Sequence, residues 1–221
     1  MLSKKFFQFF SELERNNSRE WFHDHAADFK AHVQAPFIAL VEQLLHHMQL
    51  RDPLITMAAK DALFRIHRDV RFSKNKAPYK TAMGAAIGRG GRKDMAEPGL
   101  YIEAHARGGH VAGGIYMPSR EQLADIRSWI ADHHDELDRA LNEPAFVHAF
   151  GSLRGDRSKV MPAEFRDAVA SAPLIVHKQF YYWGDITKED LMAPDAAERI
   201  MAKHDAAAPL NEILSRALHG E

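Results

Sequence analysis

The stretch Leu100–Met117, LYIEAHARGGHVAGGIYM, decides the fold, because two segments of alternating apolar and polar residues flank a pair of glycines. Gly108 and Gly109 suit a two-residue β-turn, so we expect an antiparallel hairpin around them. The polar side chains between Tyr101 and Tyr116 then share one face. The opposite face must cover a core, and it holds Leu100, Ile102, Ala104, Ala106, Val111, Ile115 and Met117.

Three helices are expected ahead of this sheet. Aromatic and apolar residues recur at helical spacing from Ser3 up to Asn16, which gives a first amphipathic helix. Asn17 followed by Glu20 fits an N-cap and its reciprocal partner, so a second helix should start there. Pro36 suits the first turn of a third helix, whose apolar stripe continues to about residue 50.

The second half of the chain combines helices with one more strand. Ser119 and Gln122 form the pattern of a capping box, which opens a helix after the hairpin. The segment Leu174–Gly184, LIVHKQFYYWG, is rich in β-branched and aromatic residues and predicts a strand. Helix then closes the chain, with a break near Pro209. We therefore expect one domain over residues 1–221 with an α+β fold, in which N-terminal helices pack on one face of a mainly antiparallel sheet and further helices follow toward the C-terminus.

The chain is nearly neutral overall, with a formal net charge of −1, but its positive charge is concentrated. Residues 65–93 hold nine Lys or Arg and one acid, a local charge of +8, while the rest of the chain carries −9. Proteins that coat polyanions usually have a basic excess over the whole domain, so this distribution predicts one local cationic site.

The absence of cysteine excludes disulfides and fits a reducing compartment, so we expect a soluble cytoplasmic protein with no membrane contact.

The centre of the cationic site is the stretch Arg68–Lys80, RDVRFSKNKAPYK. Apolar and polar residues alternate over Phe64–Phe72, which predicts a strand with Arg68 on its apolar face. Either the strand bulges at Arg68 or acceptors hold its guanidinium inside. Pro78 cannot donate to a ladder, so the chain around it should turn. The candidate ligand-binding residues are Arg68, Asp69, Arg71, Ser73, Lys74, Lys76, Tyr79 and Lys80.

Two functions fit these residues. Like charges at this density repel one another unless something neutralises them, and Arg and Lys bind phosphate and carboxylate oxygens well. The first hypothesis is therefore a site for a phosphate-bearing small molecule or a nucleic-acid end, with Phe72 and Tyr79 as stacking surface. In the second, the segment belongs to a non-catalytic interaction module, and its basic strand docks an acidic partner surface or the acidic C-terminal half of the chain. A plain solvated strand face with salt bridges to the acidic remainder of the chain is the alternative to both. Phenylalanine and tyrosine side chains are more often buried than exposed, so the alternative place for Phe72 and Tyr79 is the core.

The first hypothesis gives each side chain a role. The arginines clamp oxygens, the lysines supply positive field, Ser73 and Tyr79 donate hydroxyl hydrogen bonds, and Asp69 orients an arginine. If a bond is broken, Asp69 or His67 is the candidate base. The chain has no nucleophile elbow and no cofactor signature, so we expect no cofactor and leave catalysis open.

Histidines on the predicted hairpin are the best candidates for metal ligands. The predicted turn sets His105 opposite Ala112 and Arg107 opposite His110, and it puts both histidines on one face with Glu103. A ligand from another strand would have to complete the site, so we expect no metal.

Four blocks of the sequence resemble those of a conserved family of bacterial and fungal proteins that is known only as a domain of unknown function. The blocks are NNSREWF at Asn16–Phe22, QAPF at Gln34–Phe37, RDVRFSKNKAPYKT at Arg68–Thr81 and GGIYMPS at Gly113–Ser119. They fall in order along the chain, and the basic block is long enough to be specific. The resemblance implies one domain of the length of this chain and brings no activity with it.

The sequence departs from the family pattern in two places. Asn75 stands where the family usually has Asp, which weakens the idea that an acid there does proton chemistry. The segment Gly155–Phe165 lacks the family's Leu-Lys pair and its Pro-basic-Gly turn, so nothing is carried over from it.

Overall fold

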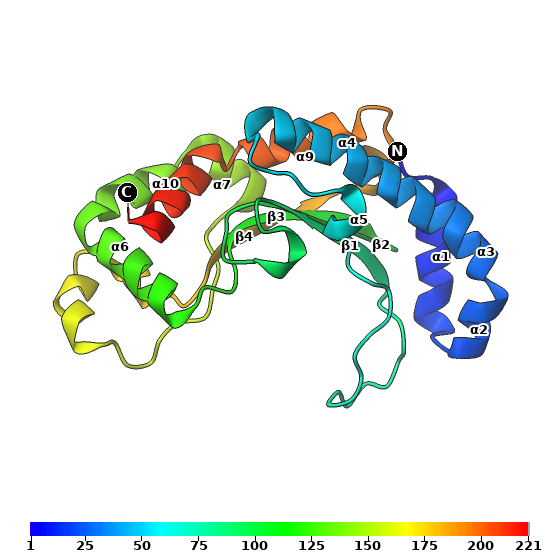
Figure 1. Cartoon of the computed structure of the whole chain (residues 1–221), viewed down its shortest axis with the longest axis horizontal. Helices are drawn as coiled ribbons and strands as arrows, with labels where there is room; N and C mark the ends of the chain where they lie inside the picture. Colours follow the sequence, from blue (N-terminus) through cyan, green and yellow to red (C-terminus); the bar gives the residue numbers. More distant parts are fainter. Residues whose placement is uncertain (221) are drawn as a thin grey trace. The chain divides into compact units, whose positions relative to one another are not determined.

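The computed structural model describes residues 1–220 (Figure 1). Contacts group the chain into two compact units, each built from several segments. Unit 1 comprises Met1–Ile87, Tyr101–Val111 and Asp185–Met201, and unit 2 comprises Gly88–Leu100, Ala112–Gly184 and Ala202–Glu221. The single domain expected over the whole chain stays a prediction. No helix within residues 1–220 combines the length and the apolar character that crossing a bilayer requires.

A four-stranded antiparallel sheet, in the order β1-β2-β3-β4, confirms the predicted α+β class. Strand β2 shows the expected alternation, because its apolar side chains are buried and the polar side chains between them are half-buried. The strands β1 to β4 are Ala82–Ile87, Leu100–His105, Gly108–Ile115 and Phe180–Ile186.

The hairpin between β2 and β3 forms, but its turn lies two residues earlier than predicted. Ala106 and Arg107 separate the strands, and Gly108 and Gly109 begin β3. Gly108 has a φ of +139°, and a Cβ atom there would lie 2.7 Å from the carbonyl oxygen of Ile186. Glycine is therefore required by the close approach of β4 rather than by the turn. Because the displacement is an even number of residues, the predicted faces are kept along β2 and the first part of β3. Met117 was expected on the core face, but it lies beyond β3 and is 64% exposed.

Two long helices of unit 1 pack through their aromatic faces. Phe6 of α1, Lys4–Arg15, stacks on Phe37 of α4, Ala35–Arg51, with ring centres 6.3 Å apart, and both side chains are fully buried. Pro36, expected as the first residue of this helix, is its second, because α4 starts at Ala35 directly after a π-helix. Figure 1 shows α4 passing over β1, which it contacts. The shorter helical segments are α2 Arg19–Asp24, α3 Ala26–Asp28, a π-helix Phe29–Gln34, α5 Ala59–Ala62, α8 Lys188–Met192 and α9 Ala196–Asp205, whose last residues belong to unit 2.

The N-cap of α2 is Ser18 rather than Asn17. The Ser18 hydroxyl accepts a hydrogen bond from the backbone N–H of Trp21 at 3.2 Å. Both residue types cap helices well, but the Asn17 amide is engaged with the backbone of Tyr79 instead. The spacing of capping residues near Asn17 does not reveal that its partner is Tyr79, 62 residues away.

Unit 2 is organised around the long helix α6, Arg120–Leu141, which begins at the predicted capping box of Ser119. Helix α6 packs along α10, Ala208–His219. Their buried side chains share one core with Phe180 and Tyr182 of β4. The shorter segments of this unit are α7 Pro144–Phe150 and the 3-10 helices Gly91–Lys93, Ala163–Phe165 and Asp167–Val169.

The strand predicted over Leu174–Gly184 is right only in its second half. Pro173–Val176 is a 3-10 helix, and β4 starts after it. The buried Arg127 of α6 donates to the carbonyl oxygens of Ile175 and His177 at 3.0 and 3.2 Å. A guanidinium thus occupies backbone acceptors that a longer strand would use in its ladder.

His177 is buried in unit 2, with 5% of its surface exposed. Burial, followed by the positive charge of Arg157, lowers the pKa of His177 below the ordinary histidine value. The unfolded chain therefore binds this proton at a higher pH than the folded chain does. The resulting stabilisation is fully present above the unfolded value of about 6.5 and is lost as the pH falls below it.

We predict that the free energy of unfolding falls as the pH drops below about 6.5, the unfolded value, by up to about 1.4 kcal/mol per pH unit for this proton. His177→Phe keeps a flat ring beside Phe180, whose centre lies 6.0 Å away, and should make the decline shallower. Urea unfolding at a series of pH values measures both slopes. His46→Ala, at an exposed site on α4, should leave the slope unchanged. An equally steep decline in His177→Phe would contradict the role given to His177.

Candidate functional site

The basic cluster lies on an irregular hairpin of residues 65–80, the basic hairpin, which follows α5 and leads into β1 in unit 1. Figure 1 shows this segment extending away from the sheet as a long loop between α5 and β1. Two backbone hydrogen bonds of 2.8 Å join its arms, from Lys80 to Ile66 and from Arg68 to Pro78. These bonds continue the antiparallel course of the sheet without forming a regular strand.

The regular strand predicted over Phe64–Phe72 is wrong. Within this segment the structure has only an isolated bridge, between His67 and Tyr79. Pro78 has no N–H to extend the ladder, and the chain beyond Arg68 bends into the tip. Of the two alternatives for Arg68, the second holds, because acceptors within the hairpin receive its guanidinium.

The root of the basic hairpin is anchored to the turn between α1 and α2. The Asn17 Nδ2 donates to the carbonyl oxygen of Tyr79 at 3.0 Å, and the Tyr79 N–H donates to the Asn17 Oδ1 at 3.1 Å. The Tyr79 ring stacks on Phe22 with ring centres 4.0 Å apart, and Tyr79 is only 8% exposed. Tyr79, a candidate ligand-binding residue, therefore holds the hairpin to the helices.

Three candidate residues brace the tip from inside. The Arg68 guanidinium donates to the carbonyl oxygen of Ala77 at 3.1 Å and to the Ser73 hydroxyl at 3.4 Å. The Lys76 ammonium donates to the carbonyl oxygen of Val70 at 3.0 Å. Carbonyl and hydroxyl oxygens are neutral acceptors, so they fix these cations without cancelling their charge.

Asp69 and Arg71 form the one side-chain ion pair of the basic hairpin within residues 1–220. The Arg71 Nη2 lies 2.7 Å from the Asp69 Oδ2. The hydrogen bonds of this pair lower the pKa of Asp69 and raise the pKa of Arg71. A carboxylate stabilised in its charged form is a weaker base, which argues against Asp69 as a proton acceptor. Arg71 still has 77% of its side chain exposed.

Phe72 stands at the tip with 96% of its surface exposed, so its alternative place in the core is wrong. The Arg71 guanidinium lies beside it, 5.9 Å from the ring centre. The bend of the tip releases Phe72 from the apolar face on which regular alternation would place it.

The remaining cations of the hairpin face solvent in different settings. Arg65 and Lys74 are exposed, and neither makes a hydrogen bond or ion pair with any of residues 1–220. The Lys80 ammonium lies 5.2 Å from the ring centre of Phe64. Partial burial lowers the pKa of Lys80, and the nearby Glu103 carboxylate opposes that shift.

The structure thus divides the eight candidate residues into two groups. The cations that face solvent are Arg71, Lys74 and Lys80. The residues that hold the hairpin together are Arg68, Asp69, Ser73, Lys76 and Tyr79. Nothing in the sequence indicated the tether at Asn17, because that contact depends on the path of the hairpin. Of the two places expected for Phe72, the exposed one holds.

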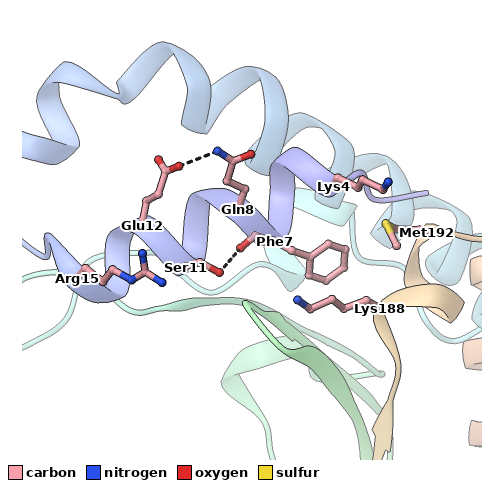
Figure 2. Close-up of a pocket in the computed structure, with 8 residues that line it drawn as sticks. All are labelled: Lys4, Phe7, Gln8, Ser11, Glu12, Arg15, Lys188 and Met192. Atoms are coloured by element: carbon pink, nitrogen blue, oxygen red, sulfur yellow. Dashed lines mark hydrogen bonds between the residues drawn. The ribbon is translucent and has the colours of Figure 1, made fainter.

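A separate groove of about 550 Å³ lies along α1 (Figure 2). The Lys188 ammonium points toward Phe7 there, 5.5 Å from the ring centre, and Gln8 donates to Glu12 at 2.8 Å. No residue of the basic hairpin lines it. The lining residues are Lys4, Phe7, Gln8, Ser11, Glu12, Arg15, Lys188 and Met192.

Two of the three residues weighed as metal ligands come together on the polar face of β2 and β3. The ring centres of His105 and His110 lie 5.1 Å apart. Glu103, the third, accepts a hydrogen bond from the Tyr101 hydroxyl at 2.7 Å. Across residues 1–220, no group of three or more His, Asp or Glu side chains has the arrangement of a metal site.

Comparison with known proteins identifies a family and no characterised relative. A family model described as conserved hypothetical protein (DUF2461) matches residues 5–212, in agreement with the resemblance of the four sequence blocks. No curated protein and no solved structure matches the chain. Function is therefore inferred from the site itself.

We predict that Asn17→Ala loosens the basic hairpin. The substitution leaves the N–H and carbonyl of the buried Tyr79 without their partners, at a cost of about 1–3 kcal/mol. Amide hydrogens in both arms should exchange faster, and trypsin should cut sooner after Lys74 and Lys76. The matched control is Asn16→Ala, which removes a hydrogen bond at the exposed end of α1. Equal protection of the hairpin in the two variants would show that Asn17 is not its anchor.

Proposed function

The chain belongs to the DUF2461 family of conserved hypothetical proteins, and from its basic hairpin we propose that it binds single-stranded nucleic acid. The observation that carries the proposal is an exposed aromatic ring, Phe72, at the tip of a hairpin whose cations are mostly held by neutral acceptors or face solvent. Sites for single strands combine basic groups that follow the phosphates with aromatic rings on which bases stack.

The charge of the hairpin supports a polyanionic partner. Residues 65–80 hold six Lys or Arg and one acid, a formal charge of +5. Two unit charges about 4 Å apart in water repel by about 1 kcal/mol, and Asp69 relieves this repulsion mainly at Arg71. A nucleic-acid strand would neutralise several cations together and release its condensed counterions.

The exposure of Phe72 supports a partner with flat faces. Leaving this ring in water forgoes about 1.5–3 kcal/mol relative to burying it. A base stacked on an aromatic side chain contributes about 1–3 kcal/mol. The Arg71 guanidinium lies 5.9 Å from the ring centre, so the phosphate next to a stacked base would meet a cation.

An extended strand fits this surface better than one small phosphate compound does. Arg68, one of the two arginines that would clamp a small ligand, already donates to a carbonyl oxygen of the hairpin, and so does Lys76. The exposed cations Arg65, Arg71 and Lys74 are spread from one arm to the tip. Cations distributed in this way suit a row of phosphates.

The rival function is that of a non-catalytic interaction module that docks an acidic protein surface. The exposed ring of Phe72 also favours this function, because an aromatic anchor in a partner pocket is typical of protein interfaces. Polyglutamate separates the two functions, since it offers negative charge without bases. Equal affinity for polyglutamate and for an oligonucleotide of the same charge would favour the docking module.

We predict that Phe72→Ala weakens the binding of a short fluorescent single strand by about 1–3 kcal/mol and leaves its salt dependence nearly unchanged. Lys74→Gln should reduce the slope of log affinity against log salt by about 0.7, because one phosphate contact is lost. Fluorescence polarisation over a salt series measures both effects. Both side chains are exposed, so neither variant should lower the melting temperature.

The matched control for charge is Lys60→Gln, which removes an exposed cation on α5 outside the hairpin. This variant should keep the salt slope of the unmodified chain. If Phe72→Ala and Lys74→Gln bind the strand as Lys60→Gln does, the basic hairpin is not the binding site.

A further inference from the structure

A second group of polar side chains lies on the polar face of the sheet in unit 1. His105 at the end of β2 and His110 in β3 have ring centres 5.1 Å apart and ring planes inclined by 47°. Asp185 of β4 joins them, with 2.9 Å between its Oδ1 and the His110 Nδ1. Two imidazoles at this distance repel when both are protonated, so the arrangement favours at least one neutral ring.

The surroundings of His105 keep it neutral and fix its proton. Its Nδ1 accepts a hydrogen bond from the backbone N–H of Arg107 at 3.1 Å, which places the ring proton on Nε2. Burial, then His110 and Arg107, lower the pKa of His105, while Glu103 and Glu14 oppose the shift. A neutral imidazole that presents an Nε2–H group can donate to an oxygen that gains negative charge.

The surroundings of His110 favour the opposite tautomer. The Asp185 carboxylate approaches Nδ1 without hydrogen-bond geometry, but its negative charge at 2.9 Å still favours a proton on Nδ1 and leaves the lone pair on Nε2. His110 has 23% of its side chain exposed and Asp185 has 88%. Asp185 therefore acts on His110 through electrostatic attraction rather than through a hydrogen bond, and His110 Nε2 is the candidate base of the pair. One ring thus offers a donor and its neighbour offers a base.

This pair is connected to the root of the basic hairpin along one strand face. The ring centres of Phe64 and Tyr101 lie 6.0 Å apart, and the Lys80 ammonium lies over Phe64. The Tyr101 hydroxyl donates to Glu103, which stands two residues before His105 on the same face of β2. A strand bound along the hairpin can therefore continue over β2 toward the two histidines.

We propose that His105 and His110 form a catalytic pair that cleaves RNA held by the basic hairpin, an inference that rests on the proposed nucleic-acid binding. The His110 Nε2 takes the proton of a ribose 2′-hydroxyl, and the 2′-oxygen forms a bond to the adjacent phosphorus. The bond from phosphorus to the 5′-oxygen breaks, and that oxygen receives the proton from His110. The His105 Nε2–H donates to a non-bridging oxygen as its charge rises. The products are a 2′,3′-cyclic phosphate and a 5′-hydroxyl end.

RNA is the substrate class because it carries its own nucleophile. The site presents a base and a hydrogen-bond donor, and the chain has no cysteine to attack phosphorus. The 2′-hydroxyl supplies the attacking oxygen within the substrate, so the step balances without a further reactant. DNA lacks this hydroxyl and should be bound without being cut.

The test uses end-labelled single-stranded RNA and DNA of one sequence, in EDTA, with cleavage followed on gels and binding followed by polarisation. The full chain should cut RNA to a cyclic phosphate and leave DNA intact. His110→Ala and His105→Ala should each slow cleavage, by at least about 100-fold for His110, with unchanged binding. Asp185 acts through His110, so Asp185→Asn should lower the single-turnover rate and leave KM unchanged. His46→Ala, exposed on α4, should cut at the full rate.

The outcomes separate the two proposals. RNA that is bound and stays intact overturns the catalytic pair while the binding function stands. RNA that is neither bound nor cut overturns both. Cleavage by His110→Ala at the rate of the unmodified chain overturns the pair, because the activity then comes from elsewhere. Asp185 is exposed, so loss of cleavage in a folded Asp185→Asn variant, checked by its melting temperature, supports the role given to Asp185.

Discussion

The candidate site depends on the Asn17 side chain, which pairs with the backbone of Tyr79 as a neighbouring strand would. Asn17 satisfies both the N–H and the carbonyl of Tyr79, so the root of the basic hairpin is paired as it would be in a sheet. The Phe22 ring packs on Tyr79 beside this pairing. Because the root is fixed by a neutral amide and an apolar stack, neither anchoring contact uses a carboxylate. Its positive charge therefore remains available at the tip.

Neutral groups rather than carboxylates also orient two cations of the tip. Arg68 and Lys76 are oriented by carbonyl oxygens, which are dipoles rather than charges. Had acids filled these positions, the segment would be a set of salt bridges on a solvated surface, which is the ordinary arrangement of a charge run. The hairpin instead combines a defined shape with a charge that only Asp69 offsets from within. This combination distinguishes the hairpin from an ordinary solvated charge run.

The sequence predicted most of the elements whose signals are local. The helices around α1 and α4, the capping box at Ser119 and the alternation of β2 all depend on neighbours within a few residues. The errors arose where a distant partner decides the outcome. Asn17 serves a backbone 62 residues away instead of its own helix. For Phe72 the sequence left an exposed stacking surface and the core both open, and the bend of the tip decides for exposure.

The displaced turn between β2 and β3 shows how the packing of β4 affects the contacts of His105 and His110. With the turn at Gly108 and Gly109, His110 would lie opposite Arg107, and His105 would lie opposite Ala112. The close approach of β4 requires glycine at the start of β3, and the turn moves to Ala106 and Arg107. The Arg107 N–H then reaches the His105 Nδ1, and the two imidazoles come within 5.1 Å. The packing of one backbone against another thus sets the hydrogen bond at the His105 Nδ1, a contact that no pattern within the hairpin sequence reveals.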